Sequence, residues 1–214
     1  MLARAFARRG ARVRGIDVAE NQIEQARRLA EQEGLDVAFD VCPAESMTAE
    51  DGSLDVVSAG QSWLYFDKPS VIPRVLKALK PEGRLVMTSL AWLPFRDPIA
   101  KRSDDLVLKF NPDWKGAHHR GSVPGVSDAL KKEFDLTTFH AMLYPMPSSR
   151  DSWRGRYLAC RGIGASLSDR EIGAFDQAHR EMLEEHAPER FEIMHEMVVS
   201  VFTRKGVLRS DTGG

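Results

Sequence analysis

The chain has 214 residues, and 30 lysines and arginines face 31 aspartates and glutamates, so its formal net charge is −1. Hydrophobic residues make up 43% of the sequence and charged residues 29%, a globular balance that excludes a long disordered chain. The near-neutral charge argues against nucleic-acid binding through a basic surface. No apolar run reaches the roughly 18 residues that a membrane span needs. The length predicts one domain, residues 1–214.

The compartment is predicted from the cysteines and the N-terminus. Cys42 and Cys160 are too few for a disulfide scaffold, which predicts a cytoplasmic location, and Cys42 reads as a packing thiol. Residues 1–16 hold five arginines and no acid, as a transit peptide does, but the stretch lacks the serines of one. A short basic surface helix is the better interpretation.

Helix-like and strand-like segments alternate through the first 90 residues. Segment 54–59 is nearly continuous in apolar residues, which predicts a parallel strand buried on both faces. The run 81–83, Pro-Glu-Gly, predicts a turn before the next strand. Gly10 and Gly34 predict helix ends. The predicted helices are 2–9, 21–33 and 69–79, and the predicted strands are 12–17, 37–41, 54–59 and 84–90.

The second half is less regular. We predict helices over 97–108, 128–133, 150–167 and 168–186, and strands over 134–143 and 192–203. Ser168 and Glu171 form the S-x-x-E pattern of a capping box. The order predicts an α/β fold with a doubly wound, mostly parallel sheet and a helical insertion, residues 148–186, before the last strand. Such folds usually begin with a strand and a glycine-rich loop, whereas this sequence opens on a helix.

Several motifs together resemble the class I S-adenosylmethionine-dependent methyltransferases, and specifically a bacterial small-molecule type similar to methyltransferase type 11. The resemblance covers nearly the whole chain. It rests on residues 12–17, 44–47 (AESM), 54–63 (LDVVSAGQSW), 59–67 (AGQSWLYFD), 75–86 (VLKALKPEGRLV), 92–94 (WLP), 111–114 (NPDW), 153–156 (WRGR) and 162–167 (GIGASL). The departure is at the front, because in the family a strand and a G-x-G-x-G loop precede the helix that begins here near Leu2. A truncated gene model or a protein that has lost the loop would explain this, and either puts the activity of the chain in doubt.

The resemblance implies a cofactor site for S-adenosylmethionine. Asp17, at the end of a predicted strand, would accept hydrogen bonds from the ribose hydroxyls; from the residues alone it also suits an N-cap. Val18 would flank the adenine, and the Ala44 backbone with Glu45 would contact the adenine edge. Gly60 would allow close backbone approach, and Gln61 would orient the amino-acid end of the cofactor or the acceptor.

Aromatic residues are the candidates for the substrate site. Trp63 and Tyr65 offer faces for a sulfonium cation, or pack under the next helix. Trp92, and Trp153 of the insertion, would cover the acceptor. Arg154 and Arg156 would bind an acidic acceptor or form ordinary salt bridges, and salt bridges are favoured.

Histidines supply the candidate general bases. His119 and His195 are the two that we predict as catalytic, for an acceptor with a proton to lose. The pair His118-His119 could hold a metal, but it lacks a companion cysteine and helical spacing, so no metal site is predicted.

Three functions remain open at this point. The first is methyl transfer to a small-molecule acceptor, without nucleic acid or membrane partners. The second is a nicotinamide-dependent oxidoreductase, which an acid at the end of the second strand also suits, although no Tyr-x-x-x-Lys pair exists. The third is a non-catalytic or partner-dependent remnant, because loss of the first strand would leave neighbouring edges unpaired for a partner chain to fill. The acceptor and the oligomeric state stay unassigned.

Overall fold

A computed structural model describes residues 2–117, 119–121, 126–164 and 166–206. The chain forms two compact units. The first unit comprises Met1–Thr88, Pro124–Phe139 and Val199–Gly214, and the second comprises Ser89–Val123 and His140–Val198. The predicted insertion 148–186 falls within the second unit. None of the helices in the described ranges is both long and apolar enough to cross a membrane.

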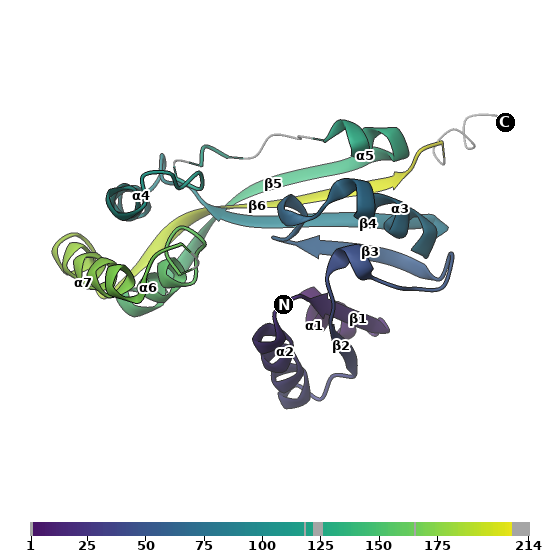
Figure 1. The fold of residues 1–214 in the computed structure, drawn as a ribbon, viewed down its shortest axis with the longest axis horizontal. Coiled ribbons are helices and arrows are strands. Elements are labelled where there is room, and N and C mark those ends of the chain that lie inside the picture. Colours follow the sequence, from purple (N-terminus) through teal and green to yellow (C-terminus); the bar gives the residue numbers. More distant parts are fainter. Residues whose placement is uncertain (1, 118, 122–125, 165, 207–214) are drawn as a thin grey trace. The chain divides into compact units, whose positions relative to one another are not determined.

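The first unit opens with a small α/β layer (Figure 1). It consists of α1 (Leu2–Ala7), β1 (Val13–Asp17), α2 (Glu20–Gln32) and β2 (Val37–Val41). Strands β1 and β2 pair in parallel, from Val13 opposite Val37 to Asp17 opposite Val41. Gly10 and Gly34 have φ of 83° and 63°, so both predicted helix ends are confirmed as left-handed turns. A core of Ile23, Ala30 and Phe39 holds α2 on the two strands.

A second sheet has the order β3-β4-β6-β5. Its strands are β3 (Leu54–Gly60), β4 (Leu79–Trp92), β5 (Phe134–Ser149) and β6 (Arg190–Arg204). Strands β3 and β4 are parallel and are joined through η2 (Trp63–Tyr65) and α3 (Lys68–Ala78). In the first unit, α3 and α5 (Asp128–Glu133) cover a core that includes Val71, Val75, Leu85 and Phe134.

Two details of this sheet correct the sequence predictions. Segment 81–83 is not a turn between elements but part of β4. The strand pairing shifts there, since Leu54 lies opposite Leu79 and Val56 opposite Arg84, and β4 therefore bulges. Strand β3 is not buried on both faces, because it is an edge strand and Val56 keeps 41% of its surface exposed.

Helix α1 packs against one glycine of each sheet. A Cβ on Gly15 of β1 would lie 3.7 Å from the Ala3 Cβ, and a Cβ on Gly60 of β3 would lie 2.7 Å from the Leu2 Cδ1. Gly60 is therefore needed for close packing against this helix, whereas Gly15 leaves room for the Phe39 ring of β2, which a Cβ would approach to 2.8 Å. The sheets stay separate in the described structure, so β1 and β3 each have one edge without a hydrogen-bonded strand.

The second unit is built from α4 (Pro98–Phe110), α6 (Arg150–Leu158) and α7 (Asp169–His186), with α6 and α7 side by side (Figure 1). The predicted capping box is confirmed, since the Ser168 hydroxyl accepts from the Glu171 backbone and the Glu171 carboxylate accepts from the Ser168 backbone. Asp97 caps α4 through Oδ1, which accepts from the backbone of Ile99 and Ala100. Its Oδ2 accepts from the Met194 backbone N–H in β6 at 3.0 Å.

Two of the sequence motifs, residues 111–114 and 162–167, contact each other in this unit. The Asn111 side chain donates to the Gly162 carbonyl at 2.9 Å. A Cβ on Gly162 would lie 2.8 Å from the Trp114 indole, so only glycine lets that ring pack there. Motifs 111–114 and 162–167 are thus explained by packing within the helical unit.

Candidate functional site

The carboxyl end of β1 presents an available carboxylate. Asp17 is exposed, and its Oδ1 accepts from the Ala19 backbone N–H at 2.9 Å. This contact serves the turn before α2, whose N-cap is Ala19 rather than Asp17. Within the described ranges Oδ2 has no partner, so it can accept a hydrogen bond from a ligand. Val18 follows with 68% of its surface exposed, an apolar side chain next to that carboxylate.

The carboxyl end of β3 carries a strained residue. Gln61 has φ of 61°, and it is the one non-glycine residue with positive φ in the described part of the chain. Its backbone N–H donates to the Thr88 carbonyl at 2.9 Å, which fixes the peptide at the end of the parallel pair. A left-handed non-glycine residue is strained, and such residues cluster at functional sites. Gly60 before it is packed against Leu2, as described above.

Other predicted cofactor residues have internal partners. Ala44, in η1 (Ala44–Ser46), is buried in the core of the first unit. The Glu45 carboxylate accepts from the Asp67 backbone N–H at 2.9 Å, at the start of α3. These contacts position η1 beside α3. They leave Asp17 and Val18 as the predicted residues with an exposed group that a cofactor could meet.

The two aromatic candidates of η2 differ in exposure. Trp63 packs against the core of the first unit and meets Phe66 edge-on, with ring centroids 5.7 Å apart. Tyr65 keeps 51% of its surface exposed. Tyr65 is therefore the aromatic face that a ligand could reach more easily.

The second unit brings three predicted residues into one aromatic cluster. Trp92 of β4 lies edge-on to Trp153 of α6 with centroids 5.6 Å apart, and Trp153 lies edge-on to His195 of β6 at 6.3 Å. Tyr157 completes the cluster, 5.2 Å from both tryptophan rings. Trp153 is only 3% exposed, which gives it a packing role in this structure. Its predicted contact with substrate stays a prediction.

The hydrogen bonds of His195 fix its neutral tautomer. Its Nδ1 lies 2.9 Å from the Ile193 carbonyl oxygen, and because a carbonyl can only accept, Nδ1 carries the proton. Nε2 then bears the lone pair and has no partner in the described ranges. Burial lowers the pKa of His195, and the charge of Arg156 lowers it further against the opposing effects of the Ile193 carbonyl and Asp97. The imidazole is therefore neutral at pH 7 and able to accept a proton.

His119 stands apart from His195. Its Nε2 lies 3.9 Å from Oε2 of Glu196, the residue next to His195 on β6. Neighbouring residues of a strand point to opposite faces, so the two predicted bases flank β6 from opposite sides and cannot act as one pair. His118 lies outside the described residues. The described ranges contain no group of three potential metal-ligating side chains.

Sequence reasoning missed a buried polar network around Ser103. The Ser103 hydroxyl lies 3.0 Å from His179 Nε2 and accepts from Trp153 Nε1 at 3.0 Å. Asp104 accepts from Tyr157 at 2.6 Å and from Trp92 at 3.1 Å. The available signal was spacing, because positions 103 and 104 share the buried face of α4 with positions 100 and 107.

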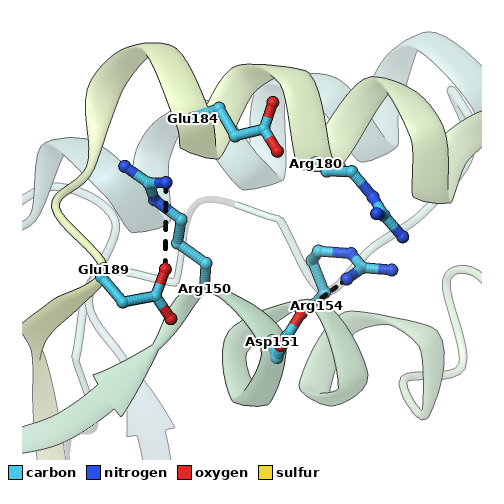
Figure 2. Close-up of a pocket in the computed structure, with 6 residues that line it drawn as sticks. All are labelled: Arg150, Asp151, Arg154, Arg180, Glu184 and Glu189. Atoms are coloured by element: carbon cyan, nitrogen blue, oxygen red, sulfur yellow. Dashed lines mark hydrogen bonds and ion pairs between the residues drawn. The ribbon is translucent and has the colours of Figure 1, made fainter.

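A charged pocket of about 210 Å³ lies between α6, α7 and the start of β6 (Figure 2). Three arginines and three acids line it: Arg150, Asp151, Arg154, Arg180, Glu184 and Glu189. Arg154 is paired with Asp151 and with Asp176, and Arg150 donates to the Ala187 carbonyl at the end of α7. The favoured salt-bridge interpretation of Arg154 agrees with these contacts. The three positive and three negative side chains of the lining balance in charge. The ion pair between Arg154 and Asp176 links α6 to α7, which gives these charges a structural role.

Known proteins resemble the chain in sequence and in fold. A family model described as a methyltransferase domain matches residues 2–134. A ubiquinone biosynthesis O-methyltransferase of Xanthomonas campestris pv. campestris (strain B100) is 28% identical over 176 residues, which cover 75% of this chain and 70% of that protein.

Solved structures share the fold at low sequence identity. A protein from Anaeromyxobacter dehalogenans assigned to the type II methyltransferases has a TM-score of 0.54 at 18% identity, covering 90% of this chain and 80% of that one. The cyclase SpnF also has a TM-score of 0.54, at 20% identity, covering 94% and 70%. At such identities the likeness shows the fold alone. The matching family model spans more than half of the residues, and the chain belongs to the class I S-adenosylmethionine-dependent methyltransferases.

Proposed function

We propose that this protein transfers a methyl group from S-adenosylmethionine to a hydroxyl group of a small molecule in the cytoplasm. The observation that carries the proposal is the exposed Asp17 carboxylate at the end of β1, with one oxygen available to a ribose hydroxyl. Family membership and the O-methyltransferase relative support the reaction type. A nicotinamide-dependent reaction has no comparable support.

The fit to the cofactor rests on the carboxyl ends of the strands in the first unit. Asp17 Oδ2 would accept from the ribose, and the exposed Val18 would contact the adenine. Gln61, held in its strained conformation, would orient the amino-acid end. Ala44, Glu45 and Gly60 stay proposed contacts through their backbone. When bound, S-adenosylmethionine supplies an electrophilic methyl group on a sulfonium.

The proposed acceptor residues act on a hydroxyl. His195 Nε2 bears a lone pair at neutral pH and would take the hydroxyl proton as the new oxygen–carbon bond forms. Trp92 and Trp153 belong to the same aromatic cluster as His195, and these two residues, together with Trp63 and Tyr65 of the first unit, stay proposed substrate contacts. His119, whose Nε2 lies 3.9 Å from Oε2 of Glu196, is the second candidate base. Such a reaction depends mostly on positioning, so few catalytic side chains are needed.

Calorimetric titration with S-adenosylhomocysteine tests the cofactor site. Asp17→Asn should weaken binding at least tenfold, since a charge-assisted hydrogen bond is lost. Asp36→Asn is the matched control, because Asp36 is exposed just before the start of β2 and its side chain forms no hydrogen bond or ion pair within the described ranges. Equal binding by wild type and both variants would remove Asp17 from the site.

A second candidate function is supported by the free strand edges. In the described part of the chain, strands β1 and β3 each lack a hydrogen-bonded strand on one side, and α1 packs against a glycine of each. The alternative is a non-catalytic module that becomes complete when another polypeptide segment adds a strand there. If the chain gives a cooperative unfolding transition yet fails to bind S-adenosylhomocysteine, this candidate replaces the first.

A further inference from the structure

Among the described residues, Arg156 is a cation without an acidic partner. It is exposed on α6, and its guanidinium lies over the Trp92 ring, 5.3 Å from the centroid. Across the described ranges no carboxylate forms an ion pair with it. Arg154, two residues earlier on the same helix, is by contrast bound to Asp176 at 2.7 Å and to Asp151 at 2.8 Å. Arg154 therefore links α6 to α7, whereas the Arg156 guanidinium forms no ion pair in the described ranges.

The carboxylates near Arg156 are occupied by internal donors. Asp97 accepts from the backbone of α4 through Oδ1 and from the Met194 N–H through Oδ2. Asp104 accepts from Tyr157 and from the indole of Trp92, the same ring that lies under Arg156. Neither carboxylate forms an ion pair with Arg156 in the part of the chain that the structure describes.

Arg156 is also near the proposed base. The tryptophan under its guanidinium packs on Trp153, which packs on His195. The field of Arg156 is felt at the His195 imidazole, where it helps to lower the pKa of that group. One cluster within the second unit thus contains the guanidinium of Arg156, the rings of Trp92 and Trp153, and the neutral imidazole of His195.

We propose that Arg156 binds a carboxylate group of the acceptor, so that the enzyme selects acidic hydroxyl compounds. This deepens the proposed function and rests on it. A guanidinium presents two parallel N–H donors that match a carboxylate, and stacking on Trp92 restricts its orientation in advance. The hydroxyl of the same acceptor would donate to His195 Nε2. The enzyme would then select the carboxylate over a neutral analogue, because the neutral analogue would leave the Arg156 charge without a partner.

The test compares two probes that differ only in charge. These are 3,4-dihydroxybenzoate and its amide, 3,4-dihydroxybenzamide, titrated into the chain saturated with S-adenosylhomocysteine. Wild type should bind the carboxylate at least fivefold more tightly than the amide. Arg156→Gln should remove that preference by weakening carboxylate binding alone, and Arg156→Lys should keep part of it, because the charge stays while the planar fork is lost.

Arg170→Gln is the matched control. Arg170 is exposed in the first turn of α7, and its replacement changes the net charge by the same amount. This variant should keep the full preference for the carboxylate. Equal binding of the two probes by wild type, no binding of either, or the same loss in Arg170→Gln would overturn the proposal. Because S-adenosylhomocysteine binding is measured first, failure of the proposed function shows as its absence, whereas failure of the Arg156 proposal leaves it intact.

Discussion

Ser103 on α4 and His179 on α7 meet through a 3.0 Å hydrogen bond between the hydroxyl oxygen and Nε2, and both residues are fully buried. The same hydroxyl accepts the indole N–H of Trp153 on α6. A single oxygen therefore connects the three helices of the second unit. These contacts replace hydrogen bonds that water would make to the buried polar groups, although His179 Nδ1 has no partner among the described residues.

Ser103→Ala should destabilise the second unit. The change removes the acceptor of Trp153 Nε1 and the partner of His179, and leaving buried polar groups unsatisfied costs about 1–3 kcal/mol. Urea unfolding followed by tryptophan fluorescence measures this. Ser46→Ala, at an exposed serine of η1, should stay within about 0.5 kcal/mol of wild type. Equal midpoints for the two variants would mean that the network contributes nothing.

Acid should weaken the protein through His179. Burial lowers the pKa of His179 from 6.5 to about 4, with Asp176 opposing and Arg154 assisting the shift. The folded state keeps this imidazole neutral while the unfolded chain protonates it below pH 6.5. The stability contribution is therefore present above pH 6.5 and is lost as the pH falls toward 4, by about 3 kcal/mol in all.

Urea unfolding at a series of pH values between 7.5 and 4 would detect the His179 effect. His179→Gln should flatten the dependence between pH 6.5 and 4, because glutamine does not titrate. His186→Gln is a suitable control, since His186 is exposed at the end of α7. If the stability of His179→Gln falls with pH in parallel with that of wild type, another group causes the loss of stability in acid.

Gln61→Gly should separate stability from binding. Glycine adopts positive φ without strain. The free energy of unfolding of the variant should therefore be equal to that of wild type or higher by up to about 1 kcal/mol. Affinity for S-adenosylhomocysteine should fall, because the side chain is proposed to contact the cofactor. Gly34→Ala gives the reverse comparison: the backbone at Gly34 has φ of 63° with open space around it, and alanine should cost about 1 kcal/mol without affecting binding.

Arg154→Gln should cost more than loss of an exposed ion pair. Arg154 makes two hydrogen bonds to Asp176, and both side chains are largely shielded from solvent. Hydrogen bonds to charged groups contribute about 1.5–3 kcal/mol. Lys101→Gln, which breaks the exposed pair with Asp105, should cost at most about 0.5 kcal/mol. Thermal unfolding of the two variants gives the comparison, and similar melting temperatures would contradict it.

Local patterns predicted most elements well. The predicted strand 37–41 coincides with β2, and the predicted helix 128–133 coincides with α5. Long-range pairing was the part that local patterns could not supply. Proline and glycine at 81–83 signal a turn, yet pairing with β3 holds the segment in β4 as a bulge. Val56 reads as a core residue, but it is exposed because its strand lies at an edge.

Candidate site residues could be predicted from the sequence only where their position at the end of a strand was enough to identify them. Asp17 and Gln61 follow parallel strands, and the sequence shows this directly. The partners of Ser103 lie 50 and 76 residues away, and no local pattern relates them. For the same reason the separation of His119 and His195 onto opposite faces of β6 required the structure.

The carboxylate of Asp97 has a consequence for synthesis of the chain. It caps α4 at once through neighbouring residues, but its second oxygen accepts from Met194, 97 positions later. During translation the start of α4 can therefore form early, whereas its attachment to β6 must wait until residue 194 has left the ribosome. A nascent chain halted before residue 194 should hold α4 as a loosely docked helix and expose its apolar face to chaperones.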